Sequence, residues 1–508
     1  MPSKIYSATT FGLDSQLIEV EADLIGEAAK FIVVGLPDVA VQEARERVRS
    51  AIKNSDFAFP RQKITVNLAP ADLKKTGPIF DLPIAVAILI TKRVLELPLS
   101  EQRSVFIGEL ALNGKLRPIN GALAIAMMAK KLNLENLYLP ADNAPEASLI
   151  QGLKIFPVDS LARLVQHLKG KKLIKPCPAS QFPDHPAMNR SNIFPAIKGQ
   201  AQAKRALEIT AAGNHNLLMI GPPGSGKTLL ARSLPELLPP LTLAESLEVT
   251  KIYSVAGLLP TDQPLISERP FRNPHHTASG TALVGGGSFP KPGEITLAHR
   301  GVLFLDELPE FPRSVLENLR QPLEDGLVTV ARASQTLQFP ASFTLVAAAN
   351  PCPCGFLTDT EKECQCLPTQ ILKYQKRVSG PLLDRFDLQI EVPRIKFIDL
   401  QAEAAPDKIQ ALTKNIAEAR KIQLERFKNI PEILTNSEIP GQNIEQYCPI
   451  DETGKKLLKE AMHRLHLSAR GYHRVIKVAR TIADLAHSPT IKTEHLAEAL
   501  QFRINQEN

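Results

Sequence analysis

The sequence predicts an α/β protein in which a core with a parallel sheet follows a mixed amino-terminal domain and precedes a helical carboxyl-terminal domain. A glycine-rich motif joins an apolar strand to a helix within residues 216–234. Helices and strands then alternate, as in a parallel sheet. Near the carboxyl terminus, apolar residues recur every three to four positions among lysines and arginines, which indicates amphipathic helices. The expected division is a first domain over 1–170, a linker over 171–195, a core over 196–395 and a helical domain over 396–508.

The composition is that of a globular protein, since 44% of the 508 residues are hydrophobic and 22% are charged. The longest apolar run, IAVAILI at residues 84–90, is far shorter than the roughly 18 residues of a membrane-spanning helix, so we expect a buried strand or helix. The amino-terminal residues lack the apolar segment of a signal peptide. A cytoplasmic protein with reduced thiols and no membrane partner is therefore expected. The net charge of +7 permits an acidic partner without requiring one.

The first 170 residues combine short strands with apolar helices. KITVNLAP at 63–70 has the β-branched, alternating pattern of a strand, whereas DLPIAVAILITKRV at 81–94 is expected to be helical. Asn-Gly pairs at 113–114 and 120–121 indicate turns. The polar, proline-rich stretch that follows has no periodicity and is interpreted as a linker.

The strongest motif is GPPGSGKT at residues 221–228, which follows the apolar segment NLLMI. The glycines of such a loop let backbone N–H groups surround phosphates at the amino terminus of a helix. Lys227 is expected to reach the β- and γ-phosphates of ATP, and the Thr228 hydroxyl to bind Mg²⁺. The predicted nucleotide-binding residues are Gly221, Pro222, Pro223, Gly224, Ser225, Gly226, Lys227 and Thr228.

Two later strands end in polar residues that suit phosphate chemistry. VLFL at 302–305 is followed by Asp306 and Glu307, at the edge of an open α/β sheet where ligands bind. Asp306 is expected to hold Mg²⁺, and Glu307 to orient and deprotonate the attacking water. A third strand ends in Asn350, whose amide is expected to contact the γ-phosphate or the water. These residues predict an ATPase.

Four of the six cysteines lie in one short segment, as two C-x-C pairs separated by nine residues. Four thiolates suit tetrahedral Zn²⁺, but C-x-C is tighter than the C-x₂₋₄-C spacing that is usual in zinc sites. Three interpretations stay open: a zinc site, reduced free thiols in a loop, and a redox switch. The candidate ligands are Cys352, Cys354, Cys364 and Cys366.

Together with the phosphate loop and the strands ending in Asp306 and Asn350, the segments GPLLDRFDLQIEVP at 380–393 and LSARGYHRVIKVARTIADL at 467–485 resemble AAA+ ATPases. Among these ATPases, the chain resembles the branch that contains the Mg-chelatases and the replicative (MCM-type) helicases. Over essentially its whole length, the chain is similar to the YifB/ComM family of Mg-chelatase-like proteins. The likeness also rests on the cysteine segment and on GLPDVAVQEARERVRSAI at 35–52, VNLAPADLKK at 66–75 and FRNPHHTASGTALVGGG at 271–287.

The resemblance implies roles for two arginines. Arg385 in LLDRFD corresponds to an arginine finger, which neutralises transition-state charge at the nucleotide of a neighbouring subunit. Arg470 in SARGYHR corresponds to the sensor-2 arginine of a helical lid, with Arg474 as the weaker candidate. The alternative is that these arginines only pack on the surface or the lid. A finger that acts on a neighbour requires a ring, for which the resemblance implies a homohexamer.

The first domain resembles the protease domain of Lon through FIGELALNGKLRPINGAL at 106–123 and KKTGPIFDLPIAVAIL at 74–89. Peptide hydrolysis in that domain needs a nucleophilic serine and a lysine that activates it. At the matching positions this chain has Ile79 and Leu123, and an apolar pair cannot perform this chemistry. We therefore expect a Lon-like (S5-type) α+β domain without protease activity, used for assembly or for binding nucleic acid.

Inserts at residues 267–299 correspond to pore loops in the resembled families. Arg272, His275 and His276 in this segment are candidates for contact with DNA. A metal site at the two histidines is not expected, because side chains of adjacent residues point apart and no third ligand is evident. GLVTVARASQTLQFP at 326–340 predicts a hairpin with Arg332 near its tip, a further DNA-contact candidate.

The function that the resemblance implies is an ATP-dependent ring motor, a helicase or branch-migration enzyme of recombination or natural transformation. ATP and Mg²⁺ would be its cofactors, and branched or single-stranded DNA and recombination proteins its partners. Two alternatives stay open: a Mg-chelatase-type subunit that remodels a metal-insertion partner, and an AAA+ regulator that remodels proteins. The Lon-like domain and the cysteine segment favour the DNA motor, because typical chelatase motor subunits lack both.

Overall fold

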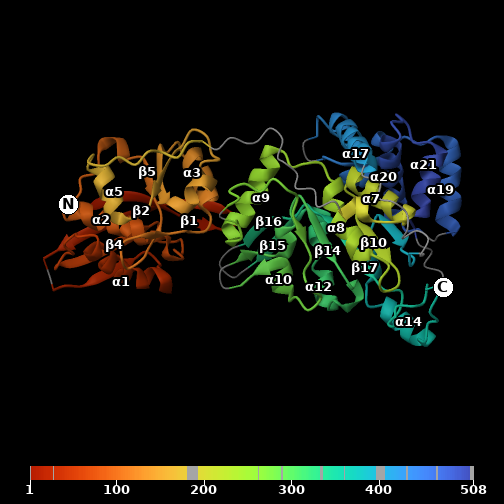
Figure 1. The fold of residues 1–508 in the computed structure, drawn as a ribbon, viewed down its shortest axis with the longest axis horizontal. Helices are drawn as coiled ribbons and strands as arrows, with labels where there is room; N and C mark the ends of the chain where they lie inside the picture. The colour runs from red at the N-terminus through yellow and green to blue at the C-terminus, as the bar shows by residue number, and fades with distance from the viewer. Residues whose placement is uncertain are drawn as a thin grey trace. The chain divides into compact units, whose positions relative to one another are not determined.

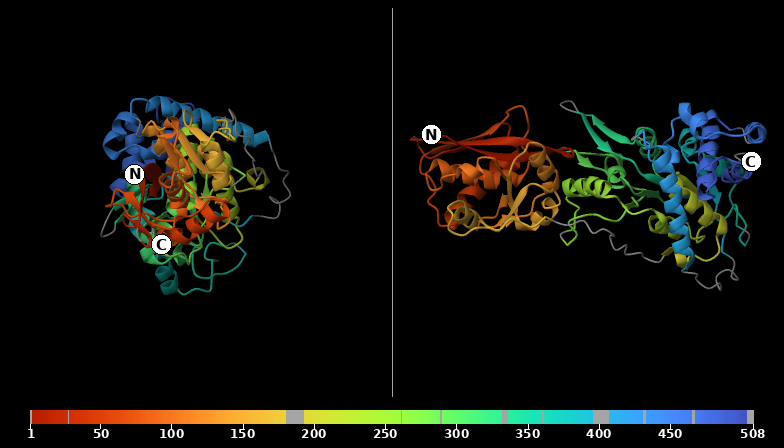
Figure 2. Two further views of the ribbon diagram at one scale, coloured as in Figure 1. Left: turned by 90° about the vertical axis from the view of Figure 1, so that its left-hand side faces the viewer. Right: turned by 90° about the horizontal axis from the view of Figure 1, so that it is seen from above.

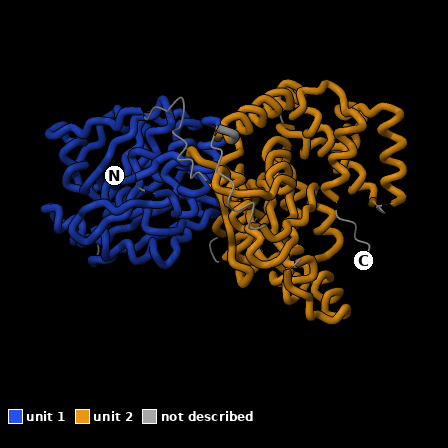
Figure 3. Tube along the Cα trace, turned by 45° about the vertical axis from the view of Figure 1, so that its right-hand side comes forward, with its two compact units in different colours: residues 1–185, 242–266 blue, residues 186–241, 267–508 orange. Residues whose placement is uncertain are grey.

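The chain forms two compact units (Figure 3). Unit 1 comprises residues 1–185 and 242–266, and unit 2 comprises residues 186–241 and 267–508. The sequence pattern does not predict that 242–266 leaves the core domain, because a helix between two strands looks the same whichever unit it packs on. The computed structural model describes residues 2–26, 28–179, 193–260, 262–287, 290–331, 336–359, 361–395, 407–430, 433–464 and 467–503.

Unit 1 is built on a seven-stranded mixed sheet with the order β3-β4-β2-β1-β5-β8-β9 (Figure 1). β1 and β2 form a long antiparallel hairpin, and β4 pairs with β2 in the antiparallel direction. β5, β8 and β9 pair in parallel, which needs crossover connections between them. The strands are β1 (Ser3–Phe11), β2 (Asp14–Ile25), β3 (Phe31–Val34), β4 (Lys63–Ala69), β5 (Ser104–Phe106), β8 (Asn136–Pro140), β9 (Lys154–Val158) and the short pair β6 (Glu109–Leu110) and β7 (Leu116–Arg117).

The helices of unit 1 bury apolar side chains against this sheet. The apolar run 84–90 lies in α2, in which every residue from Asp81 to Leu89 is buried, so the expectation of a buried element is confirmed. Within the described residues, no helix combines the length and the hydrophobicity that crossing a lipid bilayer requires. The helices are α1 (Val39–Asn54), α2 (Asp81–Thr91), α3 (Ala122–Lys131), α4 (Ala144–Ala147), α5 (Leu161–Leu168) and α9 (Leu243–Ala256).

Helix α9 contributes polar as well as apolar contacts to unit 1. The Ser254 hydroxyl donates a hydrogen bond of 2.6 Å to the Glu146 carboxylate, and Asn143 donates a second of 2.7 Å. The backbone N–H of Gly121 donates to the Ser254 carbonyl at 3.1 Å. Burial raises the pKa of Glu146, and the two side-chain donors oppose this shift. The buried carboxyl group therefore depends on α9 for part of its hydrogen bonding.

Unit 2 contains a five-stranded sheet with the order β11-β14-β17-β10-β18, in which every neighbouring pair is parallel (Figure 1). All residues of β14 and β17 are buried, as expected for central strands covered on both faces. The α/β class with a parallel sheet is thus confirmed. The strands are β10 (Leu217–Ile220), β11 (Phe271–Arg272), β14 (Val302–Leu305), β17 (Thr344–Ala349) and β18 (Leu388–Glu391), with two hairpins formed by β12 (Gly285–Gly286) and β13 (Lys291–Pro292) and by β15 (Leu327–Ala331) and β16 (Thr336–Pro340).

The helices near the carboxyl terminus lie beside this sheet (Figures 1 and 2). Their buried apolar side chains belong to the same hydrophobic core as those of the strands. Arg420 and Gln423 of α17 donate to the carbonyl groups of Ala211 and Ala212 near the end of α7, where a helix leaves carbonyl oxygens without internal partners. The helices are α6 (Ile193–Ala196), α7 (Ala201–Gly213), α8 (Lys227–Leu237), α10 (Gly280–Val284), α11 (Glu294–Leu297), α12 (Arg313–Glu317), α13 (Arg320–Asp325), α14 (Pro368–Gln375), α15 (Gly380–Leu383), α17 (Asp407–Arg426), α18 (Ile444–Tyr447), α19 (Glu452–Arg464), α20 (Ala469–Leu485) and α21 (Thr493–Gln501).

Ser254→Ala is expected to destabilise unit 1 by about 1–3 kcal/mol, because the buried Glu146 carboxyl loses a donor. The loss of stability should grow as the pH rises through the elevated pKa of Glu146, since the hydrogen bond from Ser254 favours the ionised carboxyl group. The rate of hydrogen exchange of the α9 amides in the full-length protein measures this loss of stability. The matched control is Ser246→Ala on the same helix, because among the described residues the buried Ser246 hydroxyl has no hydrogen-bond partner. Equal exchange in both variants would contradict the role given to Ser254.

Candidate nucleotide-binding site

The glycine-rich segment 221–226 forms the turn between β10 and α8. Gly224 and Gly226 have φ angles of +76° and +88°, which favour glycine over residues with a Cβ. Gly221 lies so close to the residue after β18 that a Cβ would stand 2.1 Å from the Val392 carbonyl oxygen. Because α8 begins at Lys227, the loop ends at the amino terminus of a helix, the position that favours anions.

Lys227 is buried at the centre of this loop, with 9% of its surface exposed. Its Nζ donates to the carbonyl oxygens of Gly221 at 2.7 Å and Pro222 at 2.9 Å, and to the Asn350 Oδ1 at 3.3 Å. Burial lowers the pKa of Lys227, while the charges of Asp306 and Glu307 oppose the shift. An anionic phosphate at this place would supply a close counter-charge to the ammonium group.

A hydroxyl group and a carboxylate lie beside the lysine. The Thr228 Oγ1 donates to the Asp306 Oδ2 at 2.8 Å. Oxygen ligands of these two kinds suit Mg²⁺, which usually takes one or two protein groups together with phosphates and waters. The Ser225 hydroxyl is buried without a hydrogen-bond partner among the described residues. The donor set therefore fits a magnesium nucleotide.

Glu307 follows Asp306 in a strained backbone conformation with a φ of +53°, which is uncommon for a residue other than glycine. Its side chain is 52% exposed, and its Oε2 lies 3.5 Å from the Nδ1 of His276. The sequence gives no signal for this contact, because His276 comes from the segment after β11 and Glu307 from the end of β14. Strain at an exposed carboxylate on this edge is typical of a functional residue.

The structure brings Lys227, Thr228, Asp306 and Asn350 together at the carboxyl edge of β10, β14 and β17. This convergence is what the strand-end residues predicted. The catalytic and metal-binding roles that the sequence assigns to them stay predictions.

Two of the three candidate arginines lie around one carboxylate of α13, that of Glu324. Arg385 is 4% exposed and forms an ion pair with Glu324, and its Nη1 donates to the Pro381 carbonyl at 2.6 Å. The Nη2 of Arg470 lies 3.5 Å from the same Glu324, although its side chain is 61% exposed. Arg474 instead faces Asp387 at 3.7 Å. An arginine finger at position 385 would have to leave Glu324 before it could reach another subunit.

The four DNA-contact candidates differ in their surroundings. Arg272 forms a two-bond ion pair with Glu294 at 2.6 and 2.7 Å. The His275 Nδ1 is 2.8 Å from the Thr277 hydroxyl. The expectation that the two histidines point apart was wrong, because the rings of His275 and His276 lie 4.1 Å apart. The predicted hairpin is confirmed as β15 and β16, but Arg332 lies outside the described residues.

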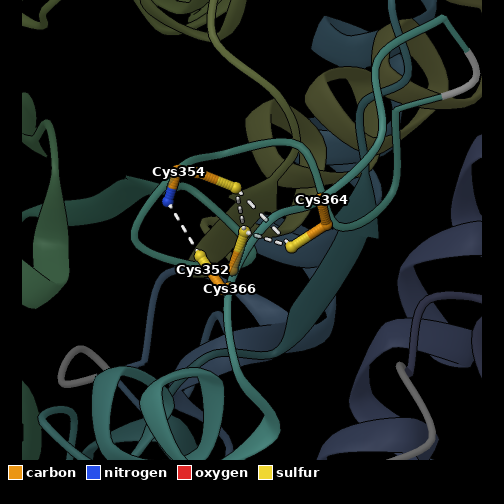
Figure 4. Close-up of side chains that lie close together, drawn as sticks. All are labelled: Cys352, Cys354, Cys364 and Cys366. Carbon is orange, nitrogen blue, oxygen red and sulfur yellow. Dashed lines mark hydrogen bonds between the residues drawn. The ribbon is translucent and has the colours of Figure 1, made fainter.

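The four cysteines of the C-x-C pairs converge in space (Figure 4). Their sulfur atoms all lie within 4.8 Å of one another. Hydrogen bonding from the Phe356 backbone N–H lowers the pKa of Cys354 to about 6, which favours the thiolate form, whereas burial raises the pKa of Cys352. Free cysteines also occur at Cys177 and Cys448.

Comparison with known proteins shows the family of this chain. The family described as "Magnesium chelatase, subunit ChlI" matches residues 194–400, "Subunit ChlI of Mg-chelatase" matches residues 20–143, and the "subunit ChlI C-terminal" family matches residues 407–503. Competence protein ComM of Haemophilus influenzae is 44% identical over 506 residues, which cover 98% of this chain and 97% of that protein. The chain belongs to the YifB/ComM family of Mg-chelatase-like AAA+ proteins.

Other relatives show how far the family likeness extends. YifB of Escherichia coli is 41% identical over 503 residues, which cover 99% of this chain and 97% of that protein. The magnesium-chelatase 38 kDa subunit of Cereibacter sphaeroides is 26% identical over 227 residues, which cover 41% of this chain and 61% of the subunit. Likeness to the chelatase subunit is therefore partial, whereas likeness within the YifB/ComM family spans the whole chain.

Lys227→Ala is expected to weaken ATP binding at least tenfold, because a buried charge at the phosphate position is removed. Titration with a fluorescent ATP analogue measures the Kd. Lys459→Ala, at an exposed lysine of α19, is the matched control and should bind as the native protein does. Unchanged affinity in Lys227→Ala would remove the glycine-rich loop as the nucleotide site.

Proposed function

We propose that this protein is an ATP-hydrolysing ring motor that acts on branched or single-stranded DNA, as a helicase or branch-migration enzyme in recombination or natural transformation. The observation that carries the proposal is the convergence of Lys227, Thr228, Asp306 and Asn350 at one sheet edge. The 44% identity to a protein named for competence supports the DNA-related part.

The hydrolysis step follows from the chemistry of the side chains. The Lys227 ammonium would bind the β- and γ-phosphates, and Thr228 and Asp306 would hold Mg²⁺, which supplies positive charge to the phosphates. Glu307 is exposed at the sheet edge and would take a proton from the attacking water. Asn350 contacts Lys227 in this structure and would orient the γ-phosphate or the water with its amide.

In a ring, each subunit would supply an arginine to the nucleotide of its neighbour. Arg385 would exchange its pair with Glu324 for the nucleotide of a neighbouring subunit, and Arg470 or Arg474 would contribute from α20. An arginine finger is worth about 10³–10⁵ in rate where such residues have been studied. A homohexamer is the proposed form, by resemblance to other AAA+ motors.

Unit 1 is proposed to be a Lon-like domain without protease activity. Ile79 and Leu123, which occupy the positions of the catalytic serine and lysine, are 8% and 0% exposed. Buried aliphatic side chains can neither attack a peptide bond nor transfer a proton. Assembly of the ring or contact with nucleic acid is the function left for this unit.

The second candidate is a chelatase-type ATPase that remodels a metal-insertion partner, and the three ChlI-type family matches favour it. The likeness to the 38 kDa chelatase subunit itself covers only 41% of this chain, whereas the likeness to ComM covers 98%. DNA dependence of ATP hydrolysis separates the two candidates, because only the DNA motor requires it.

ATP hydrolysis by the native protein is expected to rise several-fold on branched or single-stranded DNA, with stimulation falling as salt weakens phosphate contacts. Glu307→Gln should bind ATP normally but hydrolyse it about 10²–10⁴-fold more slowly, because an amide cannot accept the proton. The matched control is Glu310→Gln, three residues later, whose carboxylate pairs with Arg377. A rate indifferent to DNA at low salt sinks the DNA motor, and normal turnover by Glu307→Gln refutes its role as the base.

Mixed oligomers test the proposed ring. Arg385→Ala and Lys227→Ala are each expected to be inactive alone, but a mixture should regain activity, because one subunit supplies the nucleotide site and its neighbour the arginine. Arg377→Ala, at an exposed arginine paired with Glu310, is the matched control for Arg385→Ala and should be active alone. No activity in the mixture of Arg385→Ala and Lys227→Ala, although differently tagged subunits of the two variants purify together, would contradict a finger acting between subunits.

A further inference from the structure

The cysteine cluster has the size of a single metal ion. The sulfur of Cys352 lies 3.4 Å from that of Cys354 and 3.6 Å from that of Cys364, and the last two are 3.6 Å apart. Four Zn–S bonds of about 2.3 Å place sulfurs about 3.8 Å apart in a tetrahedron, whereas disulfide-bonded sulfurs lie about 2.05 Å apart. The spacing therefore matches a tetrathiolate site far better than a disulfide.

Two separate chain segments meet to form this cluster (Figure 4). Cys352 and Cys354 lie shortly after β17, and Cys364 and Cys366 lie shortly before α14. The backbone N–H of Cys354 donates to the Cys366 sulfur at 3.4 Å, so the two segments are joined by a bond to sulfur. Cys352 is fully buried and the other three cysteines are half-buried. One side of the cluster is therefore closed to solvent.

Few other contacts hold the segment between β17 and α14 in place. From Phe356 to Leu367 the described residues are exposed or half-buried, so they provide little apolar burial. Arg394 pairs with the covered carboxylate of Asp359 at 2.9 Å and with the exposed carboxylate of Glu361 at 3.3 Å. A long loop without its own core needs a cross-link to stay ordered, and cysteine sulfur atoms form only weak hydrogen bonds.

We propose that Cys352, Cys354, Cys364 and Cys366 bind one structural Zn²⁺ as four thiolates, and that this ion braces the phosphate side of the nucleotide site. Four protein ligands fill a tetrahedral shell, which leaves no position for substrate or water. The site is therefore structural, and the metal itself would not take part in catalysis.

Two contacts connect the cluster to the phosphate loop. Gly355, which follows Cys354, lies against Pro223 of that loop, where a Cβ would stand 2.6 Å from the proline Cδ. Asn350, two residues before Cys352, contacts the Lys227 ammonium. The ion would hold Gly355 against the phosphate loop and Asn350 beside Lys227. Loss of the metal would therefore make Asn350 and the phosphate loop more mobile.

Metal analysis of the native protein tests the site without reference to ATP or DNA. Purified under reducing conditions without chelator, the protein is expected to contain about one Zn²⁺ per chain. After exchange with Co²⁺ it should show the visible absorption of a tetrahedral cobalt thiolate. Iron as the bound metal, a disulfide among the four cysteines, or four freely titratable thiols with no metal would each overturn the proposal.

Single substitutions assign the ligands. Cys364→Ser should lose the metal and speed hydrogen exchange across 351–367 by tenfold or more. Cys177→Ser, at a half-buried cysteine of unit 1, should keep both properties. Equal metal loss in the two variants would overturn the assignment. If Cys364→Ser fails to fold, the cobalt spectrum of the native protein still shows whether the metal is bound by four thiolates.

Discussion

The parallel pairing of β10, β14 and β17 is the constraint on which the candidate site depends. Leu217 pairs with Val346, and Val302 with Thr344, so the three strands end at the same edge of the sheet. The residues that follow them therefore meet although the chain separates them widely. A slip of one residue in any of these strands would reverse its side chains and break the contacts of Lys227 and Asp306.

The arginines that the proposed ring would use at a neighbouring nucleotide form ion pairs within their own chain in unit 2. Glu324 serves both Arg385 and Arg470, and Asp387 faces Arg474. Arg474 and hydrogen bonding hold the pKa of Asp387 low in spite of the burial that would raise it. Charged groups that are paired within one chain can act elsewhere only by changing partners, and such exchange is a common basis of two-state switching in assemblies.

Much of the fold and of the candidate site could be predicted from the sequence, because the signals are local. GPPGSGKT carries its own turn and helix start, and a buried strand followed by two acidic residues locates Asp306 and Glu307. The contacts that could not be predicted join distant segments. They include the packing of α9 on unit 1, the approach of His276 to Glu307 and the ion pair of Arg385 with Glu324. Each depends on tertiary packing that no local pattern encodes.

The most direct test of the DNA motor is the rate at which the native protein migrates a four-way DNA junction. With ATP and Mg²⁺ the junction should be resolved into its product duplexes, and a non-hydrolysable ATP analogue should stop the reaction. Equal product with ATP and with the analogue would contradict the central claim. So would steady ATP hydrolysis on junction DNA that leaves every strand in place.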